Sequence, residues 1–258
     1  MDGNIILAIS LSLFAGLSTV FGGLLIFWVK EKHVKTISFG LGFSAGVMTY
    51  MALFELMKEA SMKLGSVELA IVGFMCGVVA TFVIDFFTHK IVEGRSVEEV
   101  GFLDKMKCKM ENRKAGIFTA IAIAVHNFPE GITTFSTAMV NPAFGISIAI
   151  AVAIHNIPEG FCVALPTYCA TGEKKKSILY ALYAGLAEPA GAIITYAILY
   201  KYINDFAMSM ILAGVAGVMI YISFDELLPL AKKTGKMKMG IVGFLIGILA
   251  MMGIMKLL

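Results

Sequence analysis

Long apolar runs, each close in length to the thickness of a membrane, occupy most of this chain. They cover about residues 5–29, 37–57, 69–87, 115–140, 144–169, 178–200, 206–231 and 239–255. A helix of about 20 apolar residues spans the hydrocarbon core of a bilayer. Only 15% of the residues are charged, against about 25% in a soluble domain. The sequence therefore predicts an all-α polytopic membrane protein with eight transmembrane helices, organised as a single transmembrane domain over residues 1–258.

Basic residues gather in alternate loops of this predicted chain. Seventeen of the 21 Lys and Arg residues follow the first, third, fifth or seventh apolar run. Cytoplasmic loops of membrane proteins are enriched in Lys and Arg, so these odd-numbered loops are predicted to be cytoplasmic and both termini extracytoplasmic. The compact length and the bare loops favour a prokaryotic plasma membrane, with membrane lipids around the helices.

The one long loop, at about residues 89–114, carries acidic and basic residues in nearly equal number. Nucleic-acid-binding segments carry an excess of basic charge, so no nucleic-acid partner is indicated. His89 and Cys108 are metal-type residues, but they are not clustered. The four cysteines form no CxxC pair, so no disulfide framework is indicated either. We expect a solvated cytoplasmic loop.

A hexapeptide occurs twice, as HNFPEG at 126–131 and HNIPEG at 155–160, each time in the middle of an apolar run. The repeat supplies three pairs of ligand-type residues: His126 and His155, Asn127 and Asn156, and Glu130 and Glu159. Each histidine stands four residues before its glutamate, so the two side chains share one helix face. Ionisable groups inside a membrane are costly and mark functional sites. Imidazole, carboxylate and amide oxygen together predict a cage for a divalent metal ion.

The two copies are predicted to lie at one depth. Only a short uncharged turn around residues 141–142 joins their helices, which are therefore antiparallel neighbours. Pro129 and Pro158 each remove a helical hydrogen bond, which frees a carbonyl and makes room for an ion. Gly131 and Gly160 allow another helix to approach closely at the same level.

Acidic residues in other apolar runs suggest further contacts with a cation. Glu188 falls near the middle of the sixth run and is followed by a proline. Asp225 and Glu226 fall near the inner end of the seventh run, and Glu55 near the outer end of the second. Acidic groups at both mouths would concentrate cations and pass them to the centre.

The two hexapeptides, GLAEPAG around Glu188, and SFDELLPLA at 223–231 resemble the ZIP family of divalent metal transporters. The resemblance covers essentially the whole chain and is closest to the prokaryotic branch with broad metal specificity. It implies eight spans, with helices 1–3 and 6–8 as inverted repeats around helices 4 and 5, and it implies that dimers are common. The loop at 89–114 departs from many relatives because it lacks a histidine-rich tract.

The resemblance also implies a binuclear metal site at mid-membrane. One metal would be held by His126, Glu130, His155 and Glu159. The second would be held by Asn127, Asn156 and Glu188, with Glu130 and Glu159 bridging the two.

These observations predict a transporter, not an enzyme, that moves zinc, or iron, manganese or cobalt ions, into the cytoplasm. The metal is then the transported substrate, and no catalytic cofactor is expected. An intramembrane metal-dependent hydrolase is the alternative, since the same ligands could activate a water molecule. The chain has no HExxH motif, no nucleophile motif and no exposed domain for substrate capture. A membrane metal sensor that binds without transport is a third reading.

Overall fold

The computed structural model describes residues 2–28, 34–93, 114–199, 204–233 and 235–257, and it contains helices and no strand in these ranges. The first half holds α1 (Asp2–Leu24), η1 (Leu25–Phe27), α2 (Val34–Tyr50), η2 (Met51–Leu56), α3 (Met57–Leu64), α4 (Val67–Glu93), α6 (Lys114–Val140) and α7 (Pro142–Thr171). The second half holds α8 (Lys174–Gly185), α9 (Ala187–Ile194), η3 (Thr195–Leu199), α10 (Asp205–Ile222), η4 (Ser223–Leu227), α11 (Leu228–Lys233) and α12 (Met237–Leu257).

The predicted all-α membrane architecture is confirmed. Six helical stretches in the described residues are long and apolar enough to cross a membrane, and Val67–Val83 within α4 is a shorter apolar helix. The count of eight spans stays a prediction. Large apolar side chains point outward from the bundle along α4 and α12, for example Val72, Phe82, Leu245 and Leu249. Such a surface suits contact with lipid rather than with water.

Two predicted boundaries were wrong. The second helix was expected to end near residue 57, but it continues as α3 to Leu64, and Lys63 and Glu59 form an ion pair at 3.9 Å on its surface. It ends where Gly65 takes a left-handed conformation with φ 64°. The long loop was expected from about residue 89, but α4 extends through Glu93. His89 has no described side chain, and Cys108 lies outside the described residues.

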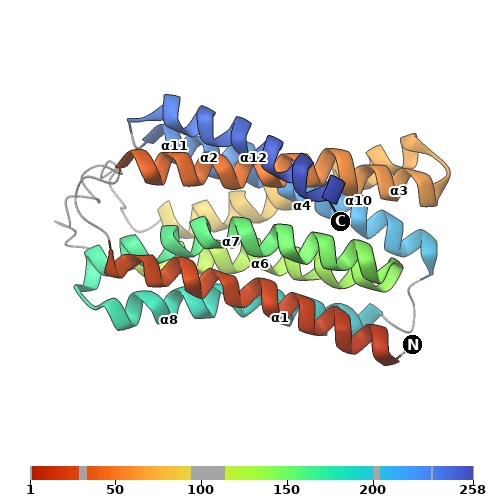
Figure 1. Ribbon diagram of the computed structural model, residues 1–258, viewed down its shortest axis with the longest axis horizontal. Helices are drawn as coiled ribbons and strands as arrows, with labels where there is room; N and C mark the ends of the chain where they lie inside the picture. Colours follow the sequence, from red (N-terminus) through yellow and green to blue (C-terminus); the bar gives the residue numbers. More distant parts are fainter. Residues whose placement is uncertain (1, 29–33, 94–113, 200–203, 234, 258) are drawn as a thin grey trace.

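The helices form two layers (Figure 1). One layer holds α1, α6, α7 and α8 with α9, and α1 packs along α7. The other holds α2, α4, α10 and α12, with α2 packed along α12 and α4 along α10. The pair that carries the hexapeptides therefore shares its layer with α1 and α8–α9, the first helix of each predicted repeat. The ligand-type residues of the hexapeptides therefore lie in the first layer, which packs against the second layer.

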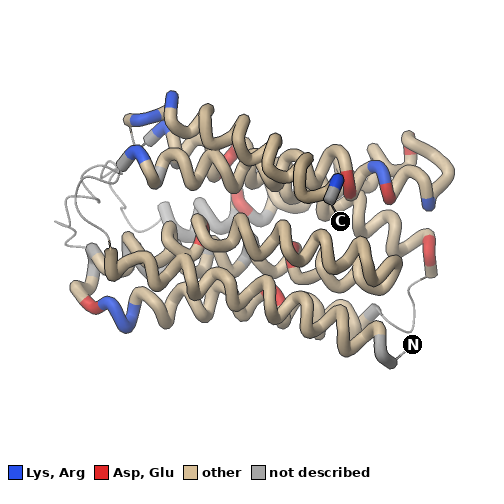
Figure 2. The backbone as a smooth tube through the Cα atoms, viewed as in Figure 1, with Lys and Arg blue, Asp and Glu red and all other residues tan. Residues whose placement is uncertain are grey.

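Both termini lie at the same end of the molecule, where α6 meets α7 (Figure 1). The described lysines gather mainly at the opposite end, where α8 begins and α11 ends (Figure 2). The basic residues of the described loops therefore gather mainly at one end, as their placement in alternate loops of the sequence predicts.

Glycines set the close approach of α2 and α12. Gly42 and Gly46 on α2, and Gly243 and Gly247 on α12, are spaced four residues apart. A Cβ atom on Gly42 would stand 1.9 Å from the carbonyl oxygen of Gly240, and one on Gly243 would stand 2.1 Å from that of Phe39. Small residues at this spacing let membrane helices pack backbone to backbone.

The wide, π-helical turns η2 and η4 occur at equivalent positions in two helices that run in opposite directions. The turn η2 joins α2 to α3, and η4 joins α10 to α11. The sequences ALFELMKEA at 52–60 and SFDELLPLA at 223–231 align through them, with Leu56 and Leu227 buried at equivalent positions. The α2–α3 and α10–α11 helices run in opposite directions (Figure 1). This arrangement agrees with the predicted inverted repeats.

Candidate metal centre

The turn between α6 and α7 brings the two hexapeptides together. Asn141 caps α7, because its Oδ1 accepts hydrogen bonds from the backbone amides of Ala143 at 3.0 Å and Phe144 at 3.3 Å. Pro142 occupies the first helical position, where its missing amide costs nothing. The helices return antiparallel, so positions 130 and 155 meet at one depth.

His155 and Glu130 face each other across the two helices. The Nε2 atom of His155 lies 2.9 Å from Oε1 of Glu130, and both side chains are fully buried. On the other side of the ring, Nδ1 lies 3.1 Å from the carbonyl oxygen of Ala151. A carbonyl oxygen only accepts, so Nδ1 carries the hydrogen, and in the neutral ring Nε2 presents a lone pair to the carboxylate. Two acceptors at this distance need a cation between them, either a proton or a metal ion.

Glu159 completes a cluster of three ligands. One ligand atom each from Glu130, His155 and Glu159 lies within 4.8 Å of the others, and all three side chains are buried. Zinc binds nitrogen and oxygen ligands at about 2.0–2.2 Å, so a small inward movement of these side chains would let the three atoms share one ion.

A second group of polar side chains lies beside the first. The Nδ2 atom of Asn156 donates to the carbonyl oxygen of Ala15 at 3.0 Å and to Oε1 of Glu188. The Nδ2 atom of Asn127 donates to the carbonyl oxygen of Ala184 at 3.2 Å. These bonds orient both amides. The buried Oδ1 atoms of Asn127 and Asn156 accept no hydrogen bond within the described part of the chain, and such acceptors are suited to a cation.

The glycine that ends each hexapeptide permits this arrangement, as the sequence predicts. A Cβ atom on Gly131 would stand 1.9 Å from the carbonyl oxygen of Glu188, which leaves no room for any other residue. A Cβ atom on Gly160 would stand 1.8 Å from the carbonyl oxygen of Thr19 on α1. Both glycines therefore bring neighbouring helices to the level of the adjacent glutamates.

The site gathers three carboxyl groups at a depth where no described lysine side chain is buried. Glu130, Glu159 and Glu188 are all buried, while none of the lysines with described side chains is. Insertion of an acidic side chain at a helix centre costs about 2.5–3.5 kcal/mol. Bound protons or metal ions are the species that can offset this cost.

Other predicted residues lie outside the cluster. Asp225 is exposed and Glu226 half-buried in η4, and Glu55 is half-buried in η2. Asp85 on α4 accepts a hydrogen bond from the Tyr221 hydroxyl of α10 at 3.1 Å. The side chain of His126 lies outside those that the structure describes.

Three contacts at the site were not predicted. The Ser44 hydroxyl of α2 donates to the carbonyl oxygen of His155 at 2.8 Å and so ties the second layer to the motif. Ala15 and Ala184 act through their carbonyl oxygens. A serine among small residues and two alanines carry no signal of such a role in the sequence.

Taken together, the fold and these side chains define a helical membrane protein with a buried set of ligands suited to a divalent cation. The family model described as ZIP zinc transporter matches residues 104–255. The chain is 43% identical to the zinc transporter ZupT of Lysinibacillus sphaericus, over 98% of this chain and 98% of that protein. It is also 43% identical to the ZupT of Oceanobacillus iheyensis, over 99% and 98% of the two chains. It is 40% identical to the ZupT of Clostridium perfringens, over 96% and 94%. The chain belongs to the ZIP zinc transporter family.

Proposed function

We propose that this chain is a metal uptake transporter that carries zinc ions into the cytoplasm through the buried cluster between α6 and α7. The contact between His155 Nε2 and Glu130 Oε1 at 2.9 Å carries the proposal, because two facing acceptors form half of a metal site. The relatives are named zinc transporters, which makes zinc the first substrate to test. The membership of the chain in a transporter family favours transport over the hydrolase alternative.

The proposed site holds two ions. Glu130, His155 and Glu159 bind the first, and the resemblance adds His126. Asn127, Asn156 and Glu188 bind the second, with Glu130 and Glu159 bridging. The proximity of the first three ligands and the contact between Asn156 and Glu188 support this division. Amide oxygens are harder ligands than imidazole, so the second position would also suit iron, manganese or cobalt ions.

The proposed orientation places the basic end of the bundle in the cytoplasm and both termini outside, in one transmembrane domain. The enrichment of lysines at that end supports it (Figure 2). Glu55 then lies toward the outer mouth, and Asp225 and Glu226 toward the inner mouth. These acids would attract the cation and pass it along, while the kinked helices alternate access. A homodimer in a prokaryotic plasma membrane completes the proposal.

Uptake by proteoliposomes with an internal zinc-sensitive dye tests the function. We expect rapid zinc influx in the wild type and a loss of about tenfold or more in Glu130→Gln and His155→Ala. Glu173→Gln is the matched control, because that glutamate is exposed at the start of α8. Wild-type rates in both site variants would overturn the assignment. Zinc binding by the wild type without influx would instead identify a sensor.

A further inference from the structure

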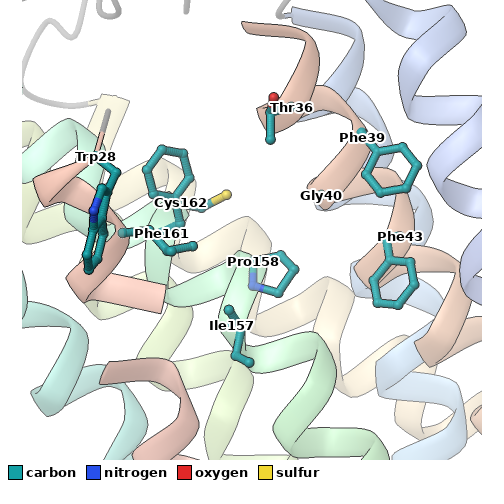
Figure 3. Close-up of a pocket in the computed structure, with 10 residues that line it drawn as sticks. Trp28, Thr36, Phe39, Gly40, Phe43, Ile157, Pro158, Phe161 and Cys162 are labelled. Carbon is teal, nitrogen blue, oxygen red and sulfur yellow. The ribbon is translucent and has the colours of Figure 1, made fainter. Parts of the chain in front are cut away.

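An apolar slot opens between η1, α2 and α7 (Figure 3). Its volume is about 400 Å³. Its walls are built mainly from Trp28 after η1, Phe39 and Phe43 on α2, and Ile157, Pro158 and Phe161 on α7. Because α2 and α7 belong to different layers, the slot lies at the boundary between the two layers.

The chemistry of the slot selects an apolar occupant. Among the described residues, no charged side chain lines the slot, and Thr36 supplies the only hydroxyl group there. The volume would hold about a dozen water molecules at roughly 30 Å³ each. Each water needs two to four polar partners, which these walls do not offer. A metal ion or a polar solute is excluded for the same reason.

The slot begins at the level of the membrane surface and extends inward. Thr36 and Phe43 mark its extent along α2, a rise of about 10 Å at 1.5 Å per residue. The apolar span formed by α1 and η1 ends at Phe27, and that of α2 begins at Ser38. The end of the slot at Trp28 and Thr36 therefore lies at the headgroup level. Lipid acyl chains are the apolar molecules present at this depth.

Basic and aromatic residues lie beside η1 and at the start of α2, two of the elements that form the slot. The Nζ atom of Lys174 lies 4.9 Å from the ring centre of Phe27 and 5.9 Å from that of Tyr168, so the ammonium group is held beside η1. Lys35 immediately precedes the lining residue Thr36 and is exposed. Trp28 is 70% exposed, as is common for tryptophan at a membrane interface.

We propose that this slot binds one acyl chain of an anionic phospholipid whose phosphate lies beside Lys35 and Lys174. The apolar walls take the chain, and the two ammonium groups select the negative headgroup. The lipid would touch Pro158 inside the second hexapeptide, but its binding does not depend on metal transport.

The single tryptophan of the chain makes the slot directly observable, because Trp28 is one of its walls. Bromine on a lipid chain quenches tryptophan fluorescence on contact. We expect brominated phosphatidylglycerol at low mole fraction, in phosphatidylcholine vesicles, to quench Trp28 more strongly than brominated phosphatidylcholine. A lysine near the surface is worth about a fivefold preference for anionic lipid, so Lys35→Gln and Lys174→Gln should each reduce the preference by about that factor.

Two glycine variants distinguish lipid binding in the slot from lipid contact elsewhere on the surface. In Gly40→Leu the new side chain enters the slot, and its Cβ stands at an ordinary 3.4 Å from Cβ of Pro158. In the control, Gly253→Leu, the Cβ on α12 meets nothing within 4 Å. We expect the preference for phosphatidylglycerol to be lost in the first variant and kept in the second. Equal quenching by the two lipids, or a preference that persists in Gly40→Leu, would overturn the proposal. If that variant fails to fold, an unchanged preference in the Lys35→Gln/Lys174→Gln double variant overturns it.

Discussion

The Nε2 atom of His155 on α7 lies 2.9 Å from Oε1 of Glu130 on α6. The carbonyl oxygen of Ala151 fixes the hydrogen of the ring on Nδ1. The two facing atoms are therefore both acceptors, and they are held together by whichever cation lies between them. A proton and a metal ion compete for this position, and the competition has measurable consequences.

Zinc binding should release protons. Because a metal ion displaces the proton shared by His155 and Glu130, the apparent zinc affinity should rise about tenfold per pH unit for each proton displaced. Calorimetry in two buffers of different ionisation enthalpy measures the release. Glu130→Gln should release fewer protons, because its amide can donate to Nε2 directly. Identical heats in the two buffers would contradict this prediction.

Replacement of Gly131 by alanine should destabilise the protein. The new Cβ would stand 1.9 Å from the carbonyl oxygen of Glu188, so α6 and α9 must separate. Overpacking of this kind costs about 1–3 kcal/mol, and it moves Glu188 away from the cluster. Thermal unfolding in detergent and zinc titration should both show the loss. Gly253→Ala, whose Cβ meets no atom within 4 Å, is the matched control. Equal melting temperatures in the two variants would count against the close approach.

Asn156→Asp should make the fold depend on metal. The substitution removes the donor to Ala15 and Glu188 and adds a carboxylate beside Glu188. An uncompensated buried charge destabilises by about 3–5 kcal/mol. We expect a lower melting temperature without metal and a larger increase on zinc addition than in the wild type. Thermal shift with and without zinc measures both. A zinc-induced increase no larger than that of the wild type would argue against a second ion near Asn156.

The glutamates of the π-helical turns η2 and η4 should affect the rate of transport and not the affinity of the site. Glu55 in η2 and Glu226 in η4 lie outside the buried ligand cluster. Acidic groups at a mouth raise the local cation concentration by about tenfold or more. Glu55→Gln and Glu226→Gln should therefore lower the initial zinc uptake while the equilibrium zinc affinity stays unchanged. Glu68→Gln, at the exposed start of α4, is the control. Uptake at the wild-type rate in both variants would remove these residues from the pathway.

The sequence predicted the membrane fold and the depth of the site for clear physical reasons. The spacing of His155 and Glu159 places both on one helix face, and the short turn at Asn141 places the second motif at the same level. It could not predict that His155 pairs with Glu130 of the other helix. That pairing depends on the relative rotation of α6 and α7, which no pattern within either hexapeptide specifies.

Some features left no local signal in the sequence. The supporting carbonyl oxygens of Ala15 and Ala184 are backbone atoms, common to every residue. The continuation of the second helix to Leu64 was missed because Lys58, Glu59 and Lys63 lower its apolar character without breaking the helix. The π-helical turns η2 and η4 have no sequence signature of their own, although 52–60 and 223–231 align through them.

Anomalous diffraction from crystals grown with zinc tests the central claim most directly. We expect a zinc peak between α6 and α7, within bonding distance of both Glu130 Oε1 and His155 Nε2. In crystals of Glu130→Gln this peak should be lost or strongly reduced. A zinc peak elsewhere in the wild type, with His155 and Glu130 still in direct contact, would contradict the account.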